Sequence, residues 1–281
     1  MTPLPVDMRE AAQAFSHILT DHNIDHAFIG GFALNLLGSN RETLDIDVEV
    51  AMDNANPNEL RLYLVQLLRE ADQRFMISSL KLFFFPNEQW DLRVPIETLA
   101  RGTLGLPHRF SILRPGDGKS KCLRLAGPAV FPVCLFLFGL VACSWLAFRN
   151  CVGGRPKQRA TRSVAYGFVR AFFRSVGSIP ILHPGVLILT KMKRSCQYIG
   201  STRPQSVVKF NSDVRDIVYL LHWLQDHGKK IDFINYNAAS PDRLYDAVRQ
   251  MRAHWVSKGE ETTVQLLDDV MEESDKATIN N

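Results

Sequence analysis

Residues 26–50 constrain the fold more than any other stretch of the chain, because an apolar run, two glycines and an alternation of acidic and apolar residues follow one another there. The pattern predicts a strand over residues 27–29, a turn at Gly30 and Gly31, a helix over residues 32–37 and, after a loop, a strand over residues 44–50. Strand side chains alternate between two faces. One face of the second strand therefore carries carboxylates and the other faces the core. The acids are Asp45, Asp47 and Glu49, and the apolar residues are Leu44, Ile46, Val48 and Val50.

A strand face that carries several carboxylates is suited to a divalent cation. Mg²⁺ prefers oxygen ligands at about 2.0–2.1 Å and usually shares them with substrate phosphates. A glycine pair between a strand and a helix lets the backbone approach a ligand closely, and the helix start offers N–H groups to an anion. The segment thus predicts a phosphate-binding turn at Gly30 and Gly31 beside a metal site at Asp45 and Asp47.

This arrangement resembles the nucleotidyltransferase fold of the polymerase β superfamily, whose signature is G-G or G-S, a helical turn and then D-x-D on a strand. The matching residues are Gly30, Gly31, Asp45 and Asp47, with thirteen residues between the second glycine and the first aspartate. The resemblance implies an α/β (α+β) fold with a mixed sheet, flanking helices and a C-terminal helical segment. Phe32 follows the glycines where the G-S variant would have a capping serine.

A third carboxylate in the resembled family comes from a further strand. Here residues 90–99 alternate in strand fashion after a predicted strand over residues 75–85. Glu97 is the preferred third metal ligand, and Asp91 is the second candidate. Either residue is also compatible with a simple solvated strand face.

The C-terminal part resembles AbiEii-type nucleotidyltransferases, in which a lysine-bearing helix precedes a K-x-x-x-D-x-x-D-I-x-x-L-L string. The matching residues are Lys191, then Lys209, Asp213, Asp216, Ile217, Leu220 and Leu221. We expect Lys191 on the polar side of its helix and a long helix over residues 212–227. Both lysines are expected to offset nucleotide phosphate charge, although a surface role fits the same spacing.

The resemblance implies transfer of a nucleoside monophosphate from an NTP, ATP among them, to an acceptor hydroxyl with Mg²⁺ or Mn²⁺ as cofactor. The expected metal ligands are Asp45 and Asp47 with Glu97 or Asp91, and Gly30 and Gly31 are expected to bind the β,γ-phosphates. The sequence does not identify the acceptor, which can be a small molecule, RNA or protein. The main alternative is a catalytically silent protein that binds a nucleotide or a partner.

Residues 101–178 differ from the rest of the chain. They hold thirteen Lys or Arg and one acid, Asp117, although the whole chain carries a net charge of only +4. Residues 129–148 contain no charge, and about 20 apolar residues suffice to span a bilayer. Three interpretations stay open for this window: a membrane anchor, a buried hairpin, and translated non-coding sequence such as a retained intron. A fourth, RNA binding by the positive charge, fits less well because aromatic residues do not interleave with the basic ones.

We expect four regions along the chain: a catalytic core (1–106), the atypical window (107–178), a helical segment (179–256) and an acidic tail (257–281) with one short helix. Five cysteines match no zinc spacing and do not pair evenly, and the N-terminus lacks a secretory pattern. These features predict a cytoplasmic protein. If residues 129–148 span a bilayer, the alternative is a single-pass membrane protein.

Overall fold

The computed structural model describes residues 6–51, 57–78, 81–86, 92–100, 112–113, 179–236 and 241–280. All of these belong to one compact unit formed by residues 1–120 and 176–281. Asp91 and residues 129–148 lie outside the described residues, as does nearly all of the window 107–178. Within the described part of the chain, no helix has both the length and the apolar character needed to cross a bilayer. The four predicted regions remain a prediction.

Within the described residues, seven strands form one mixed sheet in the order β3-β4-β5-β2-β1-β7-β6. The strands are β1 (His26–Ile29), β2 (Ile46–Val50), β3 (Phe75–Ser78), β4 (Lys81–Phe84), β5 (Val94–Ala100), β6 (Ile112–Leu113) and β7 (Ile181–Leu182). β2 pairs antiparallel with β1 and parallel with β5, so the strand that carries the aspartates is central. β7 pairs parallel with β1. This pairing attaches the chain that follows residues 107–178 to the sheet. The predicted mixed sheet is confirmed.

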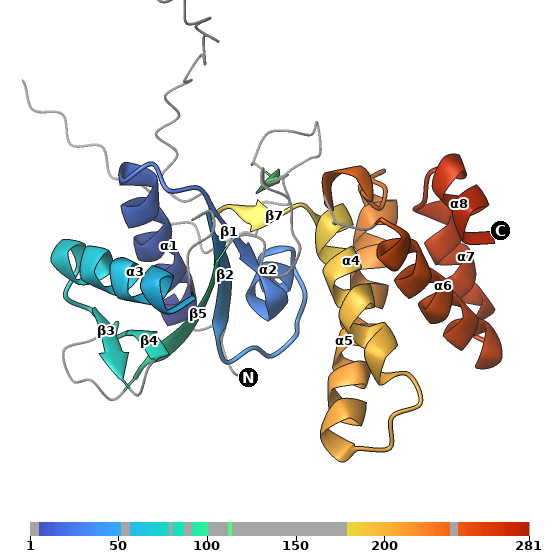
Figure 1. Ribbon diagram of the computed structural model, residues 1–281, viewed down its shortest axis with the longest axis horizontal. Helices are drawn as coiled ribbons and strands as arrows, with labels where there is room; N and C mark the ends of the chain where they lie inside the picture. The colour runs from blue at the N-terminus through green and yellow to red at the C-terminus, as the bar shows by residue number, and fades with distance from the viewer. Residues whose placement is uncertain are drawn as a thin grey trace, which may run out of the picture. The chain divides into compact units, whose positions relative to one another are not determined.

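Eight α-helices and two short 3₁₀ helices accompany the sheet within the described residues. They are α1 (Val6–Asp21), α2 (Gly30–Leu36), α3 (Pro57–Ala71), α4 (Pro184–Ser195), η1 (Cys196–Tyr198), α5 (Pro204–Asp226), η2 (Ile234–Tyr236), α6 (Asp242–Ser257), α7 (Glu261–Asp269) and α8 (Glu273–Asn280). Figure 1 shows α1 and α3 beside the sheet and the later helices grouped after β7. The predicted C-terminal helical segment is therefore confirmed.

The apolar face of β2 packs as predicted. Ile46, Val48 and Val50 are fully buried, and β1 places Phe28 opposite Val48 on the same face. The Phe15 ring of α1 meets the Phe28 ring edge to face at 6.2 Å, which is a favourable aromatic geometry. Helix α1 therefore covers this face of the sheet. The opposite face of β2 carries Asp47 and the buried Glu49.

Several element boundaries differ from the sequence prediction. Residues 75–85 form two antiparallel strands, not one, because Ser78 pairs with Lys81 and the chain reverses direction between them. Helix α5 begins at Pro204, eight residues earlier than predicted, with proline in the first turn, where its missing N–H costs nothing. The acidic tail contains two helices, α7 and α8, not one.

The start of β2 also differs from the prediction. The strand begins at Ile46, and residues 44 and 45 lie in a bend before it. Leu44 is 81% exposed and does not face the core, contrary to the prediction. Because of the bend, Leu44 does not follow the strand alternation, and Asp45 lies immediately before the first residue of β2.

Candidate metal and nucleotide site

Three carboxylates meet at the junction of β2 and β5. The parallel register places Asp47 directly beside Glu97, and Asp45 lies at the bend just before β2. One carboxylate oxygen from each of the three lies within 4.8 Å of the other two. Two oxygens bound to one Mg²⁺ can be at most about 4.2 Å apart. Small side-chain rotations would therefore bring all three oxygens onto one ion, and an all-oxygen donor set suits Mg²⁺ or Mn²⁺.

The electrostatics of Asp47 also fit a cation. Burial, followed by the negative charges of Asp45 and Glu97, raises the pKa of Asp47 from 3.8 to about 6, although Lys191 and Arg194 oppose the rise. Without a cation, the protein thus holds a carboxylate whose ionised form is unfavourable. A divalent ion among the three carboxylates would remove this penalty.

The glycine pair touches the acidic cluster directly. Gly30 has φ +66°, a conformation that residues with a side chain rarely adopt, and a Cβ at this position would overlap the Oδ2 atom of Asp47. A Cβ at Gly31 would lie 2.8 Å from the Oγ1 atom of Thr43. The predicted separate turn is instead the first turn of α2, since the helix begins at Gly30 itself. Glycine is needed here so that the α2 backbone can lie against the Asp47 carboxylate.

Gly30→Ala is expected to destabilise the protein by more than about 1–2 kcal/mol, the cost of left-handed backbone for a residue with a Cβ, because the new methyl group also displaces Asp47. Gly259→Ala is the matched control, since Gly259 has φ +71° and nothing within 4 Å of its Cβ position. Urea unfolding should show a larger loss for Gly30→Ala than for Gly259→Ala. Equal losses would show that Gly30 does not pack against Asp47 as described.

Lys191 is not on a polar helix side, contrary to the prediction. It is only 3% exposed, and its Nζ donates to the Oδ2 atom of Asp216 at 2.8 Å and lies 3.5 Å from Asp213. Arg41 also pairs with Asp216, and Arg194 donates from Nε to Asp213 at 2.7 Å. Three cations thus surround two buried aspartates, which leaves the cluster with a net charge of +1.

Arg41 and Arg194 were missed by the sequence prediction. Arg41 lies in the loop between α2 and β2, with its guanidinium carbon 3.4 Å from the Cβ position of Gly31. Arg194 lies one helical turn after Lys191 and, like it, is close enough to lower the pKa of Asp47. Arg41 could have been considered from the sequence, because it lies between the glycine pair and the D-x-D motif. Lys209, in contrast, is exposed on α5 and has no ion-pair partner within the described part of the chain.

Asp216→Asn is expected to lower the free energy of unfolding by about 3 kcal/mol, because breaking a buried pair leaves uncompensated charge. Removal of this aspartate leaves Arg41, Lys191 and Arg194 with Asp213 alone. Lys191→Met should cost less, since each aspartate keeps an arginine. Asp226→Asn, at an exposed position of the same helix, is the control for both and should be nearly neutral. Chemical denaturation measures the free energy of unfolding of the three variants. A value for Asp216→Asn equal to that of Asp226→Asn would contradict the buried network.

Comparison with known proteins gives one informative result. A solved structure described as an antigenic nucleotidyltransferase-like protein from Paracoccidioides brasiliensis aligns with 99% of this chain and 98% of its own, with a TM-score of 0.56 and 16% sequence identity. The chain has a nucleotidyltransferase-like fold. No family model matches the sequence, and no curated protein matches it. At this identity the likeness shows the fold alone, so the activity rests on the site residues.

Proposed function

We propose that this protein is a metal-dependent nucleotidyltransferase that moves a nucleoside monophosphate from an NTP to an acceptor hydroxyl. One observation carries the proposal: in a nucleotidyltransferase-like fold, the oxygens of Asp45, Asp47 and Glu97 converge within 4.8 Å beside the glycine pair. Asp45 and Asp47 are the proposed metal ligands, with Glu97 as the third. Mg²⁺ or Mn²⁺ bound there would neutralise phosphate charge and increase the acidity of the attacking hydroxyl.

The chain's own residues would bind and orient the triphosphate. Gly30 and Gly31 are proposed to donate their backbone N–H groups to the β,γ-phosphates, because the Gly30 backbone lies directly against the Asp47 carboxylate. Arg41 lies beside Gly31, so its guanidinium is placed to receive the same phosphates. Arginine binds phosphate well because its planar fork donates two parallel hydrogen bonds.

Lys191 and Arg194 would supply positive potential from the side of α4. Both lower the pKa of Asp47, so their charge reaches the site even though each is paired with an aspartate. We assign Lys191 a positioning role as well, because its contacts with Asp213 and Asp216 join α4 to α5. A role for Lys209 in nucleotide binding would require a triphosphate or acceptor that reaches the exposed face of α5.

The AbiEii-type subclass is part of the proposal. Its support is the contact between the two parts of the resemblance: the lysine of α4 bonds to the aspartates of the K-x-x-x-D-x-x-D string on α5. Asp213 and Asp216 are then explained as the buried partners of that lysine. They are not placed among the metal ligands.

Transfer of label from each of the four α-³²P-NTPs, with Mg²⁺, to protein, RNA and small-molecule fractions tests this function. The matched control is the Asp45→Asn/Asp47→Asn double variant. We expect label transfer and pyrophosphate release with the natural chain only. Nucleotide binding without transfer to any fraction would favour the catalytically silent alternative.

A further inference from the structure

The sheet face that carries the metal carboxylates continues past them onto a basic surface. The antiparallel register of β4 and β5 pairs Phe83 with Pro95, so by continuation Lys81 lies opposite Glu97. Alternate residues share a face, which places Lys81 and Phe83 on the same face as Glu97. On the next strand Ser78 pairs with Lys81. A path along the sheet therefore leads from the carboxylates to β3.

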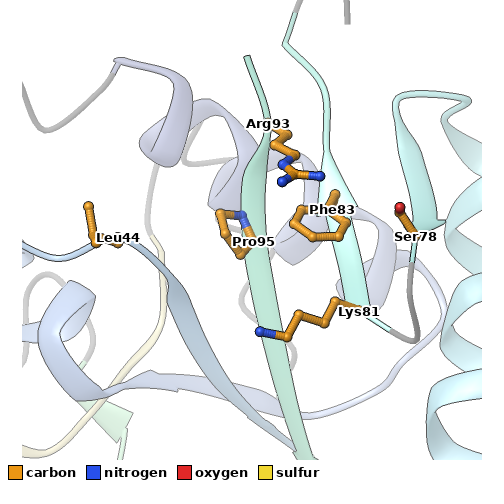
Figure 2. A pocket seen from close by; sticks show the side chains of 6 residues that line it. All are labelled: Leu44, Ser78, Lys81, Phe83, Arg93 and Pro95. Atoms are coloured by element: carbon orange, nitrogen blue, oxygen red, sulfur yellow. The ribbon is translucent and has the colours of Figure 1, made fainter. Parts of the chain in front are cut away.

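Two neighbouring cavities lie beside these strands, and the first is also lined by Leu82, Ile96 and Thr98, which alternate with the residues of this face. The first has a volume of about 290 Å³ and includes Asp45 and Glu97 among its lining residues, together with the cations Arg61 and Lys81. The second has a volume of about 470 Å³ and is lined by Leu44, Ser78, Lys81, Phe83, Arg93 and Pro95 (Figure 2). Lys81 and Pro95 line both cavities. Volumes of this size are typical of small-molecule or substrate sites.

The second cavity combines cations with an apolar floor. The Arg93 guanidinium lies over the Phe83 ring, 4.9 Å from its centroid, and Figure 2 shows Lys81 reaching from β4 toward β5. Leu44, exposed by the bend before β2, forms the opposite wall. Within the described residues, neither Arg61 nor Lys81 has a carboxylate partner, in contrast to the paired cations of α4.

We propose that these cavities bind the acceptor, and that the acceptor carries a phosphate group close to its attacking hydroxyl. This inference rests on the proposed nucleotidyltransferase function. A divalent ion would offset most of the negative charge of Asp45, Asp47 and Glu97, after which Arg61, Lys81 and Arg93 dominate the charge of the cavities. The hydroxyl binds near Glu97 and Asp45, the phosphate lies between Lys81 and Arg93, and the apolar part of the acceptor packs on Leu44, Pro95 and Phe83.

The transfer step balances for such an acceptor. The acceptor oxygen forms a new bond to the α-phosphorus of the NTP, and its proton goes to water. The α–β phosphoanhydride bond breaks, and pyrophosphate leaves with the electron pair of that bond. The three cations would repel a polycationic acceptor, so the proposal predicts that acceptors of the aminoglycoside type bind poorly.

Direct binding tests the site independently of catalysis. We would titrate the natural chain with two phosphate-bearing probes that lack the attacking hydroxyl, a 3′-deoxy oligoribonucleotide and a 3′-deoxynucleoside 5′-monophosphate, in the presence of Mg²⁺. The Lys81→Met/Arg93→Met double variant is expected to bind at least one probe about tenfold more weakly, because charge-assisted hydrogen bonds to phosphate are lost. Lys258→Met, at an exposed position after α6, is the control. Binding of both probes would indicate a small phosphate ligand, and binding of the oligonucleotide alone a nucleic-acid strand.

A transfer assay then separates the two proposals. With reactive acceptors, the double variant should raise the KM for the acceptor about tenfold while the KM for the NTP is unchanged. Phosphate-dependent binding without transfer of a nucleoside monophosphate would contradict the nucleotidyltransferase function but would still support the phosphate-binding site. The acceptor proposal fails if neither probe binds, if the double variant binds both as tightly as the control, or if an uncharged or cationic acceptor is the preferred one.

Discussion

Asp45→Asn or Asp47→Asn is expected to reduce Mg²⁺-dependent NTP turnover by at least about 100-fold, a typical loss when one preorganised electrostatic group is removed from an active site. Asparagine keeps the size of aspartate but removes the charge that holds the cation. Because Asp45, Asp47 and Glu97 lie close together, the loss of either aspartate removes one of the protein's proposed ligands to the ion and disturbs the position of the ion that the nucleotide's phosphates share. Pyrophosphate release at saturating NTP measures the effect directly.

A surface carboxylate provides the matched control. Glu59 is exposed on α3 and lines neither of the two cavities, so Glu59→Gln should leave turnover unchanged. Circular dichroism and the melting temperature should show that all three variants are folded. Turnover of the aspartate variants within a few-fold of the natural chain would show that these carboxylates do not serve the reaction.

Asp47→Asn is further expected to stabilise the metal-free protein at pH 7. The pKa of Asp47 is raised to about 6, so its ionised form is less favourable in the folded chain than in the unfolded chain. Between pH 3.8 and 6 the folded state binds more protons than the unfolded state, and stability therefore falls as the pH rises. The difference between a pKa of about 6 and one of 3.8 corresponds to at most about 3 kcal/mol at pH 7. Asparagine does not ionise and avoids this loss.

The stability difference between Asp47→Asn and the natural chain should depend on pH. The advantage of Asp47→Asn over the natural chain should be near its maximum at pH 7 to 8 and should disappear below about pH 4, where Asp47 is protonated in both states. Added Mg²⁺ should stabilise the natural chain more than the variant, since binding to the folded state adds stability. Urea unfolding from pH 4 to 8, with and without Mg²⁺, measures both effects. A variant that is less stable than the natural chain at pH 7 without metal would contradict the electrostatics described for this site.

The parts of the site that lie close together in the sequence were predictable from it. Gly30, Gly31, Asp45 and Asp47 fall within one strand–helix–strand segment, and strand alternation alone placed Asp47 opposite the apolar face of β2. Glu97 was preferred over Asp91 from its local string Ile-Glu-Thr-Leu, and the parallel register brings Glu97 beside Asp47. Local periodicity carries this information because each element buries one face.

The long-range contacts could not be read from the sequence. Arg41 pairs with Asp216, 175 positions away, and no local pattern encodes such a partner. Lys191 was expected on the polar side of its helix, but it is buried because Asp213 and Asp216 from another helix pair with it. The β3–β4 hairpin was missed because apolar residues continue on both sides of the reversal, so hydrophobicity alone gave no sign of a turn.

The most direct test of the metal site is a crystal of the natural chain soaked with Mn²⁺ and a non-hydrolysable NTP analogue, with anomalous scattering recorded for manganese. We expect an anomalous peak within coordination distance, about 2.0–2.3 Å, of oxygens from Asp45 and Asp47, with Glu97 beside it and the analogue's β,γ-phosphates at Gly30 and Gly31. Bound analogue with no peak at these carboxylates, or a peak elsewhere in the fold, would contradict the site on which the proposed reaction depends.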